Sequence, residues 1–492
     1  MFSQIKKYKK AMAEARSYDA WQDAALELDY LEGNVEWKET FASDLYNYEL
    51  IYDRLTDLRN AHQRRDHWSL IRSLREGLHH DLGNMGNYRL YNRSHVGTKH
   101  LIEEYVNQVC DSLNYVCDQD MPEMPLKKKL DFFKDTAQSF GRPVLMLSGG
   151  ATLGLFHLGV IKALWERGLL PQVITGSSIG ALVAALVGTR TDAEMPSLFA
   201  PENLCLNAWK WLGPLSGIRG QGLMDQRQLE QCFRANLGEL SFQEAYERSE
   251  RSVNISVSPV AAHQKARLLN GYTSPYLLVW SAVLASCAVP MVFPPAQLMK
   301  KDRDGNLEPY MPKLRFVDGS VVSDLPNERL MHLYNVNFSI VSQTNPHIVP
   351  WLKTNAREEK GGILALTKHV AKSEFQFHGR MMFDYFRKRA KHEAMRQISG
   401  QAYNIMAQRY GGDVTIAPRY RASDYLRLTS NPTPELLERL ILEGERATWP
   451  RIAMIRTHSK ISKTLERCVQ RLKQRMDHRR AELRVIAQGR SA

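Results

Sequence analysis

Apolar residues recur every three or four positions through the first 140 residues, a pattern typical of helices with one buried face. It predicts helices over Trp21–Leu31, Tyr46–His62, His67–His80 and Thr98–Leu113, with Ser43 and Asp66 as N-caps. Two stretches rich in turn-forming residues, LEGNVEW and DLGNMGNYRLYN, are interpreted as connections. We expect residues 1–140 to form a helical scaffold or docking domain. Its boundary is marked by Pro122, Pro125 and the run Lys127–Lys129.

From Arg142 the pattern changes to short apolar runs that alternate with helical segments. It predicts strands over Val144–Ser148 and Gln172–Thr175, and helices over Leu155–Arg167 and Ile179–Val187. Further strands are predicted over Val253–Ser258, Leu314–Val317 and Phe338–Ser342. A βαβα series is typical of a parallel sheet covered by helices on both faces. The expected fold class is therefore α/β with a mainly parallel central sheet, over residues 141–335.

The remaining part, residues 336–492, reads as a last strand followed by basic helices. Between Trp351 and Gln397 there are 11 Lys/Arg and 5 Asp/Glu, interleaved with aromatic residues from Phe375 to Phe386. We interpret that segment as an interface or lid element. Residues 451–492 hold 12 Lys/Arg against 3 Asp/Glu. An apolar stripe on the same helix consists of Ile452, Ile455, Leu465, Val469, Leu472 and Met476.

Composition and charge narrow the class of protein. With 492 residues, 43% hydrophobic and 24% charged, the chain is typical of a globular protein of two or three domains. Residues 1–140 carry a net charge of −4, so the whole-chain charge of +13 leaves +17 on the remainder. A basic surface of this kind suits an anionic partner. Nucleic acid is a weak candidate, because no helix-turn-helix spacing, zinc finger or RNP-like aromatic strand accompanies the charge.

Cysteine usage and hydropathy indicate where the protein works. The six cysteines are scattered, without CxxC pairs or Cys/His clusters, which suits a reducing compartment and no structural zinc. The N-terminus lacks the apolar run of a secretory signal. The longest uncharged stretch, Tyr272–Met299, contains four prolines and is interpreted as a buried core helix with a proline-rich exit. We expect an intracellular protein, cytoplasmic or peripherally bound to membrane.

The strongest chemical motif is Gly176-Ser177-Ser178-Ile179-Gly180. It lies between a predicted strand and a predicted helix, the context that gives GxSxG its meaning as a nucleophile elbow. Ser178 would stand at the carboxyl end of the strand, beside a helix N-terminus that favours developing negative charge. The competing interpretation is a serine that merely caps the helix.

A glycine-rich loop, Ser148 to Gly154, follows the preceding strand. Its glycines let backbone N–H groups point into a cavity, either for a phosphate or for the oxyanion of a tetrahedral intermediate. The phosphate interpretation is weakened because Ala151 replaces a third glycine and no Walker lysine follows. Adjacent strands would bring this loop and the serine elbow to one sheet edge, which makes joint sense as acyl transfer.

A serine needs a base, and no histidine occupies a suggestive strand end. His157 is the histidine nearest in sequence to the glycine loop, but a histidine on an amphipathic helix is more often packed or solvated. Asp318-Gly319-Ser320 ends a predicted strand, so Asp318 could accept the serine proton without a histidine. From spacing alone an ordinary Asp-Gly turn is the more common explanation.

The motifs GGATLG, GSSIG, ASCAVPMVFPP (Ala285–Pro295) and VDGS, in this order, resemble the patatin-like phospholipase domain. The flanking sequences LDYLEGNVEWKETFASDLYNYELIYDRL, SLREGLHHDLGNMGNYRLYNRSHVGTKHLIEEY, SQTNPH and NPTPELLERLILEGERATWP are similar to fungal and plant triacylglycerol lipases and their bacterial relatives. Those proteins carry a helical region of unknown role before the patatin domain. The resemblance covers residues from about 20 to about 465, and we expect a bacterial member.

The resemblance implies a three-layer patatin-like sandwich with a Ser–Asp dyad and no cofactor or metal. Ser178 matches the nucleophile and Asp318 the base, and Gly149, Gly150 and Ala151 match the oxyanion loop. Ala151 departs from the family's glycine, and its N–H can still donate if φ stays negative. Ser148 stands where the family has aspartate, and Ser320 where it has glycine or alanine. No histidine has an aspartate five positions on, so an HxxxxD acyltransferase motif is absent.

The implied activity is a lipid acyl hydrolase that works through an acyl-enzyme. Three alternatives stay open: triacylglycerol as substrate, phospholipase A or lysophospholipase activity, and a catalytically silent lipid-binding scaffold. An anionic membrane or a lipid-droplet surface is the expected partner. The basic helix could lie on that surface, or its apolar stripe could pack on the sheet or on a partner chain. The sequence does not reveal the oligomeric state.

Overall fold

The computed structural model describes residues 1–213, 216, 222–260, 264–319, 325–352 and 411–489, with side chains up to residue 482. The segment Phe375–Phe386 and residue Ser320 lie outside the described residues. Two compact units emerge. Unit 1 contains Met1–Pro143, Met331–Phe338 and Pro450–Ala492, and unit 2 contains Val144–Leu330 and Ser339–Trp449. The C-terminal helix thus shares a unit with the first 143 residues. The division at residues 140 and 335 stays a prediction.

Unit 1 is built from helices whose caps come from the sequence. Ser17, Asn47 and Asp66 each accept a backbone N–H of the first turn, from Ala20, Leu50 and Ser69. Asp66 was predicted as a cap, whereas Ser43 is not one, because its hydroxyl accepts from Leu45 in the preceding turn. The helices are α1 (Phe2–Glu14), α2 (Tyr18–Leu31), α3 (Asn34–Glu39), α4 (Tyr48–Gln63), α5 (His67–Glu76), η1 (Leu82–Asn84), α6 (Tyr88–Arg93), α7 (His100–Asp118), α8 (Leu126–Phe140) and α20 (Ile452–Gly489).

Two predicted connections contain short helices instead. LEGNVEW holds α3 and DLGNMGNYRLYN holds α6, so the interpretation of both as plain connections is wrong. Tertiary contacts explain α3: Asn34 and Lys38 both bond the buried carboxylate of Asp29, at 2.9 and 2.8 Å. The predicted boundary lysines are likewise helical, in the first turn of α8.

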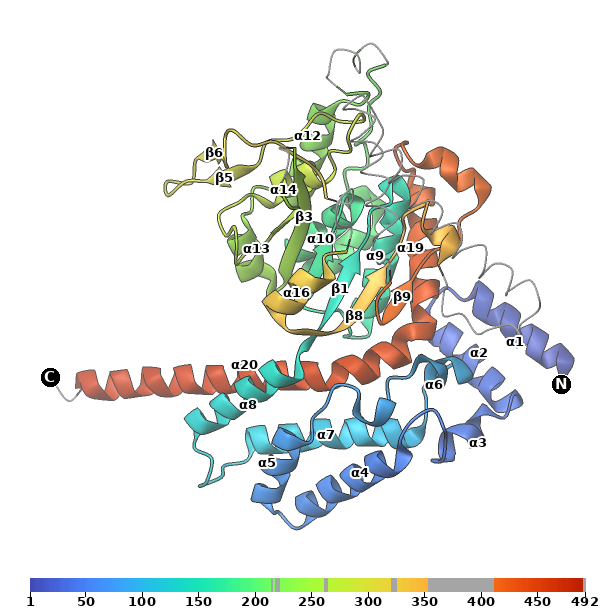
Figure 1. Ribbon diagram of the computed structural model, residues 1–492, viewed down its shortest axis with the longest axis vertical. Helices are drawn as coiled ribbons and strands as arrows, with labels where there is room; N and C mark the ends of the chain where they lie inside the picture. The colour runs from blue at the N-terminus through green and yellow to red at the C-terminus, as the bar shows by residue number, and fades with distance from the viewer. Residues whose placement is uncertain (214–215, 217–221, 261–263, 320–324, 353–410, 490–492) are drawn as a thin grey trace, which may run out of the picture. The chain divides into compact units, whose positions relative to one another are not determined.

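The apolar stripe of α20 packs inside unit 1. Figure 1 shows α8 running alongside α20, and α20 also contacts α7. Ile455, Leu465 and Leu472 are completely buried. This packing overturns the interpretation of the stripe as a membrane-facing surface, because its apolar side chains already have protein partners. The lysine and arginine residues of the helix from Arg456 to Arg480 are exposed or partly exposed.

Unit 2 centres on a seven-stranded sheet of order β4-β3-β2-β1-β8-β9, with β7 also paired to β3. β1, β2 and β3 are parallel, as are β8 and β9, which confirms the α/β class with a mainly parallel sheet. The sequence does not predict strands β4, β9 or the separate pair β5–β6; each has only three residues, and unlike β7, which is equally short, none is recognised as an apolar run. The strands are β1 (Arg142–Leu147), β2 (Val173–Gly176), β3 (Ser252–Pro259), β4 (Arg267–Leu269), β5 (Met299–Lys301), β6 (Leu307–Pro309), β7 (Phe316–Asp318), β8 (Val336–Ser342) and β9 (Val414–Ile416).

Helices cover this sheet and bury its apolar strands (Figure 1). α10 contacts β2 and β3, α14 contacts β3 and β7, and α9 packs on α19. α14 is the core helix predicted within the uncharged stretch, and all its residues are buried. No helix in the described part of the chain is both long and apolar enough to cross a bilayer. The helices are η2 (Ala151–Leu155), α9 (Phe156–Glu166), α10 (Ile179–Gly188), η3 (Asp192–Phe199), η4 (Pro201–Asn203), α12 (Gln226–Leu237), α13 (Phe242–Ser249), α14 (Val279–Ser286), α16 (Asn327–Tyr334), η5 (Val349–Trp351), η6 (Ala422–Arg427), α19 (Pro434–Thr448) and η7 (Trp449–Arg451).

Candidate active site

The turn between β2 and α10 holds Ser178 in a strained conformation. Its φ of 54° and ψ of −127° lie outside the regions that L-residues ordinarily occupy. Space dictates the flanking glycines: a Cβ on Gly176 would lie 2.1 Å from the Gly180 oxygen, and one on Gly180 would lie 2.3 Å from the Leu147 oxygen. Ser178 stands at the N-cap position of α10, but its side chain makes no capping hydrogen bond. The helix-cap interpretation is therefore disfavoured.

Ser286, at the end of α14, fixes this turn to the sheet. Its buried hydroxyl accepts from the Ser178 backbone N–H at 3.0 Å and donates to the Ser256 carbonyl of β3 at 2.7 Å. The strained turn is thus tied by a two-bond relay to the strand next to β2. Such support is what a backbone strain of this kind requires in order to persist.

The strand pairing places Asp318 in front of the same turn. Val257 of β3 pairs with both Arg267 of β4 and Asp318 of β7, so β4 and β7 occupy opposite edges of β3. Ile255 pairs with Gly176 of β2 on one edge and with β4 on the other. The pairing of β2 with β3 ends at Gly176, where the chain turns into the elbow. β7 pairs with the same edge of β3 beyond that point. Asp318 is 1% exposed there, in the shelter of the sheet.

Cys287 links the serine and the aspartate. Burial raises the pKa of the Cys287 thiol well above its ordinary value, and the nearby Asp318 carboxylate raises it further. A hydrogen bond between the thiol and the Ser178 side chain acts in the opposite direction. Because one neutral thiol interacts with both groups, Ser178 and Asp318 each lie near the buried Cys287. Sequence reasoning assigned no role to Ser286 or Cys287, and their only signal was membership of ASCAVPMVFPP.

The glycine loop lies directly against the elbow. Ser177 donates its backbone N–H to the Leu147 carbonyl at 3.1 Å, and a Cβ on Gly154 would lie 2.0 Å from Cγ2 of Ile179. Gly150 has no room for a side chain either, since a Cβ would lie 2.3 Å from Oγ1 of Thr344. The structure thus brings the two predicted loops together at the carboxyl ends of β1 and β2.

Ala151 does not meet the condition set for it. Its φ is 49°, in the left-handed region, whereas donation with a methyl group in place was expected at negative φ. An L-residue in that region costs roughly 1–2 kcal/mol relative to the right-handed conformation. The loop nevertheless adopts it, so the surrounding contacts outweigh the cost of the methyl group.

Comparison with known proteins identifies the family of this chain. A model described as a domain of unknown function (DUF3336) matches residues 1–138, and one described as patatin-like phospholipase matches residues 145–331. Triacylglycerol lipase 4 of Saccharomyces cerevisiae is 35% identical over 485 residues, which are 94% of this chain and 53% of that protein. Triacylglycerol lipase ptl3 of Schizosaccharomyces pombe is 34% identical over 466 residues, covering 92% of this chain and 95% of that protein. The chain belongs to the patatin-like phospholipase family.

Other patatin-like relatives add breadth. Triacylglycerol lipase SDP1L of Arabidopsis thaliana is 35% identical over 482 residues, covering 94% of this chain and 58% of that protein. The chain thus spans little more than half of the length of this plant protein and of the budding-yeast relative. These relatives are fungal and plant proteins, so the expectation of a bacterial member has no support in them. The solved structure of VipD from Legionella pneumophila covers 65% of the chain at 14% identity with a TM-score of 0.30, too weak a likeness to argue from.

Within the patatin-like fold, the departure at Ser148 has a structural explanation. The Ser148 hydroxyl accepts from the Thr344 backbone N–H at 2.8 Å and donates to the Gly149 carbonyl at 2.9 Å. Thr344 in turn donates its hydroxyl to the Gly149 carbonyl at 3.0 Å. The segment SQTNPH, quoted above only as part of a resemblance, therefore forms the support of the glycine loop.

His157 belongs to that support and not to the dyad. It is completely buried, with Nδ1 2.6 Å from the Ser342 hydroxyl and Nε2 2.9 Å from the Ser148 carbonyl. Burial lowers the pKa of His157 to about 4, and the hydrogen bond to the Ser148 carbonyl opposes the shift only in part. The imidazole ring is neutral at physiological pH and holds the glycine loop through the Ser148 carbonyl.

Proposed function

We propose that this chain is a lipid acyl hydrolase of the triacylglycerol lipase type, with Ser178 as nucleophile and Asp318 as its base. Ser178 attacks an ester carbonyl, and Asp318 takes the hydroxyl proton. The backbone N–H groups of Gly149 and Gly150 stabilise the oxyanion, whereas Ala151 is given no such role because its φ is not negative. The proton passes to the leaving alcohol, and water, activated by the same carboxylate, then releases the fatty acid from the acyl-enzyme.

One observation carries the proposal. Ser178 has a strained backbone, its side chain does not cap α10, and its hydroxyl interacts with the same Cys287 thiol as the Asp318 carboxylate does. Backbone strain at a serine whose side chain makes no capping hydrogen bond does not stabilise the helix. Such strain is typical of a nucleophile elbow. Asp318 sits at the adjoining end of β7, sheltered from solvent, where a carboxylate hydrogen-bonded to serine could act without histidine.

The first test compares variants on a long-chain p-nitrophenyl ester. Ser178→Ala and Asp318→Asn should each fall below about one thousandth of the wild-type rate. Ser249→Ala is the matched control, because its hydroxyl bonds the Ala245 carbonyl of α13 and the Arg251 backbone N–H, and neither group belongs to the candidate site. Full turnover by purified Ser178→Ala would refute the assignment. An inactive wild type would favour the silent scaffold instead.

The names of these relatives favour triacylglycerol as the substrate, and a lipid surface as the site of action follows from the insolubility of that substrate. Phospholipase A or lysophospholipase activity is the rival. Product analysis on triacylglycerol, diacylglycerol, phosphatidylcholine and lysophospholipid, run side by side, separates them. Fatty acid release from phosphatidylcholine at a higher rate than from triacylglycerol would favour the rival.

A further inference from the structure

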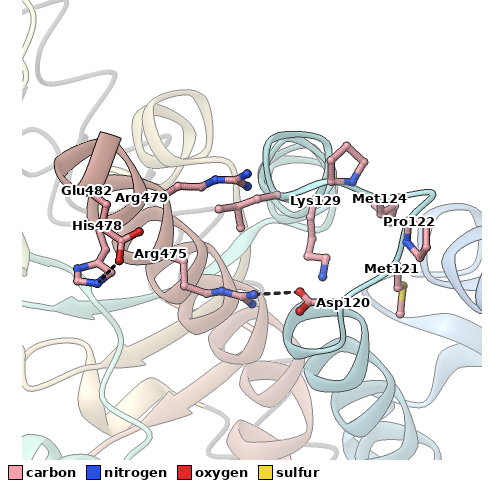
Figure 2. Close-up of a pocket in the computed structure, with 11 residues that line it drawn as sticks. Asp120, Met121, Pro122, Met124, Lys129, Arg475, His478, Arg479 and Glu482 are labelled. Atoms are coloured by element: carbon pink, nitrogen blue, oxygen red, sulfur yellow. Dashed lines mark hydrogen bonds and ion pairs between the residues drawn. The ribbon is translucent and has the colours of Figure 1, made fainter. Parts of the chain in front are cut away.

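Unit 1 contains a cavity of about 640 Å³, formed between the outer half of α20 and the turn that joins α7 to α8 (Figure 2). One wall comes from residues 120–122, 124–126 and Lys129, and the other from Arg475, His478, Arg479 and Glu482. The volume lies within the range of small-molecule sites, about 300–1,000 Å³. Every lining residue belongs to unit 1, which has no part in the proposed dyad.

The turn supplies an apolar wall. Met121, Met124 and Leu126 line it together with two prolines. Met121 is only 4% exposed, so its side chain forms the floor of the cavity and not its rim. Methionine side chains adapt readily to an irregular apolar ligand. This wall therefore suits an alkyl chain.

The α20 wall carries arginines at four-residue spacing, the repeat that places side chains on one helix face. Arg471 pairs with Asp118 at 2.8 Å, and Arg475 pairs with Asp120 at 3.4 Å. Arg479 continues the series, but no ion pair to it occurs among the described residues. Glu482, three residues beyond Arg479 on the helix, pairs with His478 at 3.2 Å. Figure 2 shows Arg479 extending from α20 toward α8.

Lys129 adds a second cation to the lining of the cavity. It is 2% exposed, and its ammonium group donates to the backbone carbonyls of Cys117 and Gln119. An ammonium group has three N–H donors, so one remains for a ligand. Burial, together with the charge of Arg475, lowers the pKa of Lys129. An anion in the cavity would restore the lost stabilisation of its charge.

We propose that this cavity binds a single-chain lipid with an anionic headgroup, a carboxylate or a phosphate. Arg479 and Lys129 hold the headgroup. Arg471 and Arg475 each pair with an aspartate, and the headgroup is the corresponding anionic partner of Arg479. The alkyl chain lies along Met121, Met124 and Leu126. The site gives the N-terminal unit a ligand-binding role that does not depend on hydrolysis at Ser178.

Binding is measured on the full chain carrying Ser178→Ala, so that no turnover occurs. Titration calorimetry with oleate below its micellar concentration should show saturable binding. Arg479→Gln should weaken it by about tenfold or more, the loss of one charge-assisted hydrogen-bonding partner. Arg480→Gln is the matched control: it removes the same charge from the next residue, which pairs with Asp477 and does not line the cavity.

Three further ligands separate the parts of the proposal. Lysophosphatidic acid, the third ligand, has a phosphate headgroup and is compared with oleate. Methyl oleate lacks the charge and inorganic phosphate lacks the chain, so each should bind at least about tenfold more weakly than whichever of oleate and lysophosphatidic acid binds more tightly. Whichever of those two binds more tightly identifies the headgroup. Equal oleate affinity in Arg479→Gln and Arg480→Gln overturns the proposal, as does equal affinity for methyl oleate, or the absence of saturable binding by both anionic lipids. Because no step needs turnover, these outcomes are independent of the hydrolase assignment.

Discussion

At the scale of single residues, both loops of the candidate site contain a non-glycine residue with positive φ. Ser178 has φ 54° and Ala151 has φ 49°. Each such residue costs about 1–2 kcal/mol and persists only where its surroundings determine it. The Ser286 relay provides this on one side, and the Ser148–Thr344 bonds provide it on the other. The site is therefore supported from α14 and from the end of β8.

His157 gives this support a pH dependence. In the unfolded chain a histidine takes up a proton as the pH falls below about 6.5, whereas in the folded chain its pKa is about 4. The unfolded state therefore binds more protons in this window, so stability is full above pH 6.5 and declines as the pH falls toward 4. At pH 5 the loss from this one residue should be about 2 kcal/mol.

The measurement is urea unfolding at pH 7 and pH 5. His157→Gln, whose amide does not titrate, should reduce the difference between the two unfolding free energies by about 2 kcal/mol. His79→Gln, at an exposed position, should leave that difference as it is. An unchanged difference in His157→Gln would show that this imidazole does not stay neutral in the folded protein.

Sequence reasoning reached these residues unevenly. The glycines around Ser178 signalled a tight turn, because only small residues fit such a crowded backbone. The positive φ of Ala151 carried no such signal, since alanine ordinarily avoids it. Ser286 and Thr344 lie 108 and 196 residues from the groups they bond, so no local pattern could reveal them. Supporting residues of this kind become visible only in the folded chain.

At the scale of elements, α9 and α19 pack so closely that backbone atoms of one helix contact backbone atoms of the other. A Cβ on Gly159 would lie 1.8 Å from the Ile441 oxygen, and one on Gly444 would lie 2.3 Å from the Phe156 oxygen. Lys162 and Glu445 complete the contact with an ion pair at 2.9 Å. Because α9 follows the glycine loop directly, this packing sets where the loop ends.

Replacing Gly159 should therefore disturb both stability and activity. Gly159→Ala forces the two helices apart and should lower the free energy of unfolding by about 3 kcal/mol, the upper part of the range for overpacking. Gly271→Ala is the control, since a Cβ there meets nothing closer than 3.8 Å. Thermal unfolding and esterase rate are both measured. A Gly159→Ala protein as stable as Gly271→Ala would mean that the helices separate without cost.

The predicted elements succeeded where the pattern was long. The strands next to the elbow and the helices α9, α10 and α14 follow from runs of apolar residues with clear ends. Three-residue strands such as β9 leave too few positions for a period to show. Helices α3 and α6 lie in turn-like sequence: Asp29 of the preceding helix bonds two residues of α3, and α6 contacts the C-terminal helix α20. Propensity alone could not find them.

At the scale of the whole molecule, folding brings the basic C-terminal helix into the same unit as the acidic first 140 residues. Residues 1–140 carry −4, but unit 1 also includes the basic C-terminal helix and has a net charge of +6. Unit 2 then carries +7. Neither unit is acidic, so an anionic lipid surface would attract both. The attraction is electrostatic, because the apolar stripe of α20 is buried, and it should weaken as salt is added.

The burial of α20 leads to a prediction about truncation. Leu465, Cys468 and Leu472 are completely buried in unit 1, where α20 packs on α7 and α8. Isolated helices are marginal in water, so the other helices of unit 1 need this partner. A chain ending at residue 449 should lose far more helical circular dichroism than α20 itself contributes. A chain ending at residue 482, which keeps these buried side chains, should stay folded and retain its unfolding temperature. If the shorter chain kept a cooperative transition and the helix content of residues 1–143, unit 1 would fold without its C-terminal helix, and the helix would be free to act as a separate surface-binding element.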